Sequence, residues 1–265
     1  MEILVTTLAG LEEVLAEELR TMGATEVHVR KRAVACVGDQ SLLYRANWML
    51  RTAIRVLLPL HQFKARHPDQ LYRGIQDIDW SQYLRPSDTL AVDAVARSEV
   101  FTHSHFVALK TKDAIVDQLR NRYGRRPSVD THSPNYRINV HIFDTNVAVS
   151  LDSSGHSLHK RGYRVANVMA PLNEVLAAGL VLLSGWQPGQ TLIDPFCGSG
   201  TILTEAALLA KNRSPQHARR EFGFMKWLDY DAGLWRSTRE NARKAETPIE
   251  GQILGSDIDR GAVSA

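Results

Sequence analysis

Apolar positions along the first sixty residues switch between the spacing of a helix and that of strands. Leu11, Val14, Leu15, Leu19 and Met22 fall on one face of a helix over 10–22. The neighbouring pattern predicts a strand over 3–7, paired strands over 27–37, a helix over 40–51 and a strand over 54–60. This strand-helix-strand-strand-helix-strand order favours a small ferredoxin-like unit, which we place at residues 1–62.

The pattern that follows predicts a second α/β unit at residues 63–152. Its expected elements are a helix over 69–78, a strand over 89–96, a long amphipathic helix over 103–123, and alternating strands over 137–143 and 147–151. We predict a linker over 153–168, because its first part, 153–164, is polar, basic and contains glycine.

Beyond the linker, the order changes to that of a parallel sheet. We expect an apolar helix over 171–186, a short buried strand over 191–193, a helix over 200–210 and another strand ending near Asp257. Strand, glycine-containing turn, helix, strand and acidic residue form the start of a doubly wound α/β domain, here at residues 169–265.

The loop between the first strand and its helix, DPFCGSGT at 194–201, is the strongest candidate for chemistry. Gly198 and Gly200 allow a ligand to approach the backbone, and Thr201 begins a helix whose free N–H groups face the same crevice. The loop lacks the lysine of a phosphate-binding loop and the third glycine of a dinucleotide fingerprint. Asp257 is placed to bind ribose hydroxyls, and the long interval before it predicts a helical insertion over 211–246.

Composition sets broad limits on the class of protein. The 265 residues are 44% hydrophobic and 23% charged, as in ordinary globular proteins. We find no apolar run of the ~18 to 20 residues that a membrane helix needs, and no signal-peptide pattern at the start. Cys36 and Cys197 lie far apart, which favours a reducing cytoplasm over a disulfide framework. The histidines at 67, 103 and 105 are not spaced as metal ligands.

Positive charge is unevenly distributed, although the net charge is only +3. Residues 110–126 hold six basic and two acidic residues, while 159–164 and 211–220 hold basic residues and no acid. Such segments favour RNA contacts, although a solvated helix face or linker would also explain them. The candidate RNA-binding residues are Lys64, Arg66, Lys110, Lys112, Arg120, Arg122, Arg125, Arg126, Lys160, Arg161, Tyr163 and Arg164.

Several stretches together resemble one enzyme family. DPFCGSGT, LHKRGYR, APLNEVLAAGLVLLSGW and TTLAGLEEVLAEEL are similar to THUMP-domain-containing, S-adenosylmethionine-dependent RNA methyltransferases, and most similar to the N-terminal half of the bacterial enzymes that methylate guanine N2 in 23S rRNA. The resemblance implies a ferredoxin-like unit, a THUMP RNA-binding module and a Rossmann-like methyltransferase domain. The S-adenosylmethionine-binding residues that it implies are Asp194, Pro195, Cys197, Gly198, Ser199, Gly200, Thr201, Glu174, Asp257 and Asp259.

The chain also departs from the family pattern at two places. The family often has a basic residue where this chain has Asn173, in the segment 170–174 that covers the cofactor. More importantly, no Asn-Pro-Pro-Tyr-type motif, which holds the target amine, occurs in these 265 residues. We therefore expect the chain to be a fragment that holds only the N-terminal part of the Rossmann-like domain, with no catalytic residue of its own and no methyl transfer when alone.

Three readings of the function stay open at this level. The first is an rRNA methyltransferase, whose continuation could carry a second fused methyltransferase. The second is a non-catalytic THUMP RNA-binding module. The third is a DNA adenine-N6 methyltransferase, because both chemistries methylate an amine with the same motif.

Overall fold

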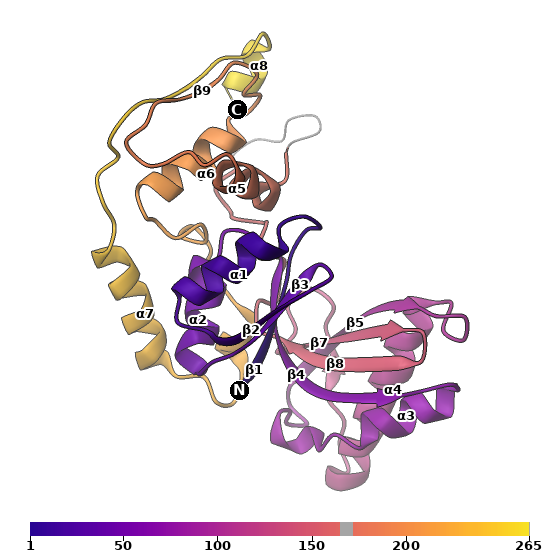
Figure 1. The fold of residues 1–265 in the computed structure, drawn as a ribbon. Helices are drawn as coiled ribbons and strands as arrows, with labels where there is room; N and C mark the ends of the chain where they lie inside the picture. Colours follow the sequence, from indigo (N-terminus) through magenta and orange to yellow (C-terminus); the bar gives the residue numbers. More distant parts are fainter. Residues whose placement is uncertain (165–171, 265) are drawn as a thin grey trace. The chain divides into compact units, whose positions relative to one another are not determined.

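The computed structural model describes residues 1–164 and 172–264, which form two compact units (Figure 1). Unit 1 combines residues 1–56 and 156–220 with the residues from Asp231 onward, and unit 2 combines 57–155 with 221–230. Each unit is therefore built from segments that are not consecutive in the sequence. The sequence led us to expect consecutive domains, whereas the N-terminal elements and the segment around DPFCGSGT belong to one compact unit.

The N-terminal part of unit 1 has the expected ferredoxin-like order. Its sheet pairs β3 antiparallel with both β1 and β2. α2 begins where the Asp39 carboxylate accepts a hydrogen bond from the Leu42 N–H at 2.7 Å, an ordinary N-cap. The elements are β1 (Glu2–Thr6), α1 (Glu12–Thr21), β2 (Thr25–Arg30), β3 (Ala33–Val37), α2 (Gln40–Met49) and β4 (Arg55–Lys64).

β4 is longer than the sequence suggested and continues into unit 2. The pattern of residues predicted a strand over 54–60, which contains Pro59, a residue without the N–H that a ladder needs. In the structure the pairing of β4 with β8 shifts register between Pro59 and His61, so the proline lies at an irregularity and the strand continues to Lys64. A bulge of this kind is one of the few places where a strand accepts proline.

Unit 2 contains a mixed sheet, with both parallel and antiparallel strand pairs, and α3 and α4 cover one of its faces (Figure 1). Within this unit the strand order is β4-β8-β7-β5-β6, with β5 parallel to β7 and β7 antiparallel to β8. Val140, Ile142 and Val149 are fully buried in its core. The elements are α3 (Pro68–Gln76), η1 (Trp80–Gln82), β5 (Thr89–Arg97), α4 (Ser104–Tyr123), β6 (Ser128–Val129), β7 (Tyr136–Phe143), β8 (Asn146–Asp152) and η2 (Gly223–Lys226).

The rest of unit 1 holds the glycine-containing loop. β9 and β10 pair in parallel, and α6 follows β9 directly. α5 starts at Glu174, because the Asn173 side chain caps it by accepting hydrogen bonds from the N–H groups of Val175 and Leu176. The expected start at 171 lies outside the described residues. The elements are α5 (Glu174–Leu183), β9 (Leu192–Asp194), α6 (Thr201–Ala210), α7 (Ala232–Lys244), β10 (Ile253–Gly255) and α8 (Arg260–Val263).

The segment expected to be a linker is packed in its described part, 153–164. Ser153, Ser154 and Leu158 are buried, and the Leu158 N–H donates to the Ile54 carbonyl at 2.8 Å. α7 lies in the interval where we expected a helical insertion. Among the described residues, no helix is long and apolar enough to span a bilayer.

Candidate cofactor site

The loop after β9 and the end of β10 lie together at one edge of the parallel strand pair. Leu192, Ile193 and Asp194 stand opposite Ile253, Leu254 and Gly255 in register. The pairing continues past the strands, because the Ser256 N–H donates to the Asp194 carbonyl and the Cys197 N–H donates to the Ser256 carbonyl, each at 3.0 Å. Both carboxyl ends therefore lie at the same edge of the strand pair, which is where α/β sheets bind their ligands.

Asp257 joins the two halves of this site. Its Oδ2 accepts a hydrogen bond from the Gly198 N–H at 2.8 Å, and its Oδ1 accepts one from the Asp259 N–H at 2.9 Å. These N–H groups lower the pKa of the Asp257 carboxyl, since a hydrogen bond to the charged form favours ionisation. The carboxylate is thus charged at neutral pH and held in place, as a group that binds ribose hydroxyls requires.

Two glycines allow the loop to take this shape. Gly200 has a φ of +73°, in the left-handed region, and is the residue before α6. A Cβ on Gly255 would lie 2.2 Å from Leu203 Cδ1 and 3.0 Å from Cys197 Cβ, so only glycine lets β10 approach the loop this closely. The sequence predicted Gly200 as a residue of the site, but not Gly255. The position of Gly255 at the end of the second strand was the feature that could have indicated its role.

The start of α6 adds backbone donors to this edge. Within 1–164 and 172–264 no side chain caps the helix, so its first N–H groups can donate to a ligand. Asp194 accepts a hydrogen bond from the Phe196 N–H at 3.1 Å, and the Phe196 side chain is 87% exposed beside it. An aromatic ring, carboxylates and free N–H groups at one edge suit a ligand with apolar and polar parts.

Cys197 is part of the loop and has no features of a nucleophile. Burial raises the pKa of its thiol, and the charges of Asp194 and Asp257 raise it further. The thiol therefore stays protonated at neutral pH, whereas a catalytic cysteine needs a lowered pKa. Its role is that of a small side chain packed under Gly255.

Arg164 connects the starts of α5 and α6. Its Nε donates to Glu174 Oε1 at 2.7 Å, and its Nη2 donates to the Leu172 carbonyl at 2.5 Å and to Thr201 Oγ1 at 3.2 Å. Glu174 was expected to contact the cofactor, yet its buried carboxylate is paired with this arginine. Arg164 thereby holds Thr201, the last residue of the glycine-containing loop and the first of α6.

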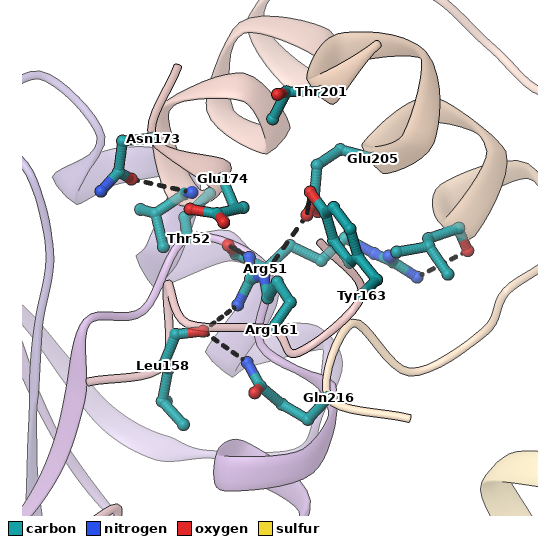
Figure 2. Close-up of polar contacts among 12 residues, drawn as sticks. Arg51, Thr52, Leu158, Arg161, Tyr163, Asn173, Glu174, Thr201, Glu205 and Gln216 are labelled. Carbon is teal, nitrogen blue, oxygen red and sulfur yellow. Dashed lines mark hydrogen bonds and ion pairs between the residues drawn. The ribbon is translucent and has the colours of Figure 1, made fainter. Parts of the chain in front are cut away.

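Arg161, one of the expected RNA contacts, lies in the interior of unit 1. Its side chain has no exposed surface, and its guanidinium donates to Glu205 Oε1 at 3.4 Å, to the Leu158 carbonyl at 2.9 Å and to the Arg51 carbonyl (Figure 2). A group without exposed surface cannot reach an RNA phosphate, so the expectation for Arg161 was wrong. Tyr163 is also turned inward, since its hydroxyl donates to Glu205 at 3.0 Å.

The remaining basic candidates are on the surface, and all four of those on α4 are paired. In the described residues, Lys110, Lys112, Arg120 and Arg122 form ion pairs with Asp69, Asp113, Asp117 and Asp79 respectively. The others are exposed: Lys64, Arg66, Arg125, Arg126 and Lys160. The structure contains no group of three or more metal-ligating side chains within 1–164 and 172–264.

A parallel strand pair with a glycine-containing loop, a helix start beside it and an acid after the second strand is typical of a Rossmann-like domain. Comparison with known families assigns each segment. Residues 2–57 match the RlmL ferredoxin-like domain, 65–152 match the THUMP domain, and 161–265 match the RMKL-like methyltransferase domain.

Two curated relatives and one solved structure are similar to nearly the whole chain. A putative RNA methyltransferase, slr0064 of Synechocystis, is 44% identical over 98% of this chain and 68% of its own length. The ribosomal RNA large subunit methyltransferase K/L of Syntrophotalea carbinolica is 42% identical over 98% of this chain, which spans 37% of it. The solved structure of SMU.472, a putative methyltransferase complexed with SAH, superposes with a TM-score of 0.88 at 31% identity, over 99% of this chain and 70% of that one. The chain belongs to the THUMP-domain-containing RNA methyltransferase family.

Proposed function

We propose that this chain binds S-adenosylmethionine and RNA as part of a methyltransferase that modifies guanine N2 in 23S rRNA. One observation carries the cofactor assignment: the Asp257 carboxylate accepts a hydrogen bond from the Gly198 N–H and so fixes the loop against the second strand. The name of the Syntrophotalea relative and the THUMP match support large-subunit rRNA as the substrate.

The described residues fit such a cofactor by their chemistry. In this proposal, Asp257 binds the ribose hydroxyls, with Asp259 beside it, and the loop from Asp194 to Gly200 surrounds the methionine part. A Cβ on Gly198 would have no heavy atom within 4 Å, so the space next to its backbone is open. The SAH complex of the SMU.472 neighbour supports this type of ligand.

The cofactor supplies an electrophilic methyl group on a positively charged sulfur. The residues of this chain contribute binding and orientation, because methyl transfer depends mainly on holding the acceptor nitrogen in line with the carbon-sulfur bond. A guanine within folded RNA must also be turned out of its stack, which costs on the order of a few kcal/mol. Contacts to the surrounding phosphates, from the exposed cations, would provide the binding energy for that step.

No Asn-Pro-Pro-Tyr-type motif occurs in the 265 residues, so we propose that the isolated chain binds cofactor and RNA without turnover. The test has two parts. Calorimetry should show S-adenosylhomocysteine binding by the 265-residue chain, and the protein as its gene encodes it should transfer labelled methyl to unmethylated large-subunit rRNA. N2-methylguanosine in the digest is the expected product. Turnover by the isolated chain would refute the inactivity, label in DNA adenine would refute the substrate, and RNA binding without any transfer would leave the binding-module function.

A further inference from the structure

A cleft lined by basic residues lies in unit 1, away from the glycine-containing loop in sequence. It has a volume of about 580 Å³, within the ~300–1,000 Å³ of typical ligand pockets. Its five cations are Lys211, Arg213, Arg236, Arg239 and Arg243, against the two acids Glu240 and Glu246. Lys211 and Arg213 belong to the basic segment 211–220, whereas the three arginines of α7 lie outside the segments expected to contact RNA. The functional site described above uses none of the five.

Three of the cations lie along one face of α7. Arg236, Arg239 and Arg243 follow the i, i+3, i+7 spacing that puts side chains on the same side of a helix. They extend over about 10 Å of the helix axis. Only Arg243 lies in the last turn, where the helix dipole alone favours a cation. The positions of Arg236 and Arg239 need another explanation.

These three arginines have no carboxylate partner. In the part of the chain that the structure describes, no acidic group lies within 4.0 Å of the guanidinium of Arg236, Arg239 or Arg243, although Arg239 lies over the Trp235 ring at 5.3 Å. On α4, by contrast, four of the expected RNA contacts are ion-paired. Charge left unneutralised on a helix face is available to an external anion.

The opposite wall of the cleft is fixed to α7. The Asn212 side chain donates to the Ala245 carbonyl, and the Thr247 N–H donates to the Lys211 carbonyl, each at 3.0 Å. Lys211 and Arg213 approach Glu246 only at 3.6 and 3.7 Å, so this single acid is shared loosely between two cations. The cleft therefore keeps its shape and an excess of three positive charges without a ligand.

α7 itself is firmly attached to the N-terminal elements. Trp235 is buried and packs edge-on against Trp48 at 5.4 Å and Tyr44 at 6.0 Å. The Asp231 N–H also donates to the Tyr44 hydroxyl at 3.0 Å. The basic face is thus presented by a supported helix, whose cations do not have to be ordered from a flexible segment when they bind.

We propose that this cleft, made by α7 and residues 211–217, binds the phosphate backbone of the RNA substrate. The inference rests on the proposed function for the identity of the polyanion. The arginines are spread over a longer distance than one phosphate group can cover, and guanidinium groups bind phosphate oxygens with two parallel hydrogen bonds. Backbone contacts of this kind position RNA without reading its sequence.

The test measures binding of a 20-nucleotide single-stranded RNA by fluorescence anisotropy, as a function of salt concentration. The test variant combines Arg236→Gln, Arg239→Gln and Arg243→Gln, because glutamine preserves helix propensity. The matched control combines Arg20→Gln, Arg30→Gln and Lys31→Gln, three exposed cations elsewhere in unit 1. Both variants lower the net charge by the same amount.

We expect the α7 variant to bind at least about tenfold more weakly at low salt, and its slope of log Kd against log salt to fall by up to ~2, since each phosphate contact contributes about 0.7. The control should keep the wild-type slope. A third variant with lysine at the same three α7 positions should keep most of the slope, which separates loss of charge from loss of folding. Equal slopes in the α7 variant and the control, or a lysine variant as weak as the glutamine variant, would overturn the proposal.

The outcome is independent of the reaction. A protein that binds RNA through α7 and yet methylates DNA would contradict the proposed function and leave the cleft assignment intact. A protein that forms N2-methylguanosine, but whose RNA binding is unaffected by the α7 substitutions, would contradict the cleft assignment and leave the proposed function intact.

Discussion

Replacing Arg161 by methionine removes a buried positive charge and leaves a side chain of similar reach. The wild-type guanidinium makes hydrogen bonds to Glu205, to the Leu158 carbonyl and to the Arg51 carbonyl, and neither Arg161 nor Glu205 has exposed side-chain surface. Removing one partner of a buried ion pair costs about 3–5 kcal/mol, because the other charge is left in the interior. The melting temperature of unit 1 should then fall by roughly 6–20 °C.

The pH dependence of this loss follows from Glu205. Burial raises the pKa of its carboxyl above 4.5, while Arg161, Tyr163 and Arg51 act to lower it. Without Arg161, the folded-state pKa rises further. Below pH 4.5 Glu205 is protonated in both the folded and the unfolded state, so this part of the cost is absent. Between the folded-state pKa of the wild type and the higher folded-state pKa of the variant, Glu205 is ionised in the folded wild type but still protonated in the folded variant. As the pH rises through that window, the variant therefore loses stability relative to the wild type.

Scanning calorimetry of the 265-residue chain at pH 5 and pH 8 tests the reasoning. The Arg161→Met deficit should be larger at pH 8. Combining Arg161→Met with Glu205→Met should recover part of it, since apolar side chains of similar size often replace a buried pair without loss. A fall in melting temperature below about 3 °C, or the same deficit at both pH values, would show that the pair does not stabilise unit 1 as described.

Three further predictions concern the cofactor loop. Asp257→Ala should weaken S-adenosylhomocysteine binding at least about tenfold by calorimetry, because it removes the proposed ribose contact together with the hydrogen bond that the Gly198 N–H donates. Glu250→Ala, at an exposed acid before β10, is the control, and equal losses in both variants would contradict the ribose assignment. Arg164→Ala should also weaken this binding, by loss of the contacts to Glu174 and the start of α6, with Arg164→Lys restoring part of the affinity; unchanged affinity in the alanine variant would mean that Arg164 only packs. Alkylation of Cys197 by iodoacetamide should be slow at pH 7 and accelerate only above about pH 9, because burial and two neighbouring carboxylates raise the pKa of the thiol from 9.0. Mass spectrometry measures the extent of labelling with time, and rapid labelling at pH 7 would refute a protonated thiol.

The order of elements could be predicted from the sequence because it depends on local patterns. The periods of apolar residues located α1, β5 and α4 to within a few residues. The approach of Asp257 to the DPFCGSGT loop was also predictable, since parallel strands bring their carboxyl ends to one edge. The end of β4 was not, because the register shift that accommodates Pro59 depends on the partner strand.

The position of Arg161 could not be read from its neighbours. HKRGYR has the composition of a solvated basic segment, yet the groups that bind its first arginine are Glu205, 44 residues away, and the Arg51 carbonyl, 110 residues away. Burial of a charge is decided by such distant partners. The spacing of Arg236, Arg239 and Arg243 in the sequence is that of one helix face, so the basic face of α7 was predictable in principle. We did not predict it, because neighbouring acidic residues lower the net charge of that segment.

The interrupted course of unit 1 affects how the chain can fold during its synthesis. Arg51 donates hydrogen bonds to the carbonyls of Leu208 and Arg213, and Leu208 is made 157 residues later. At ~5–20 residues per second, a ribosome needs roughly 8–30 s to cover that interval. Unit 2 is encoded almost entirely within it and can fold first. Until then the N-terminal strands and helices lack these partners, and the guanidinium of Arg51 stays hydrated. Unit 1 therefore completes its folding only after α6 and α7 have been synthesised.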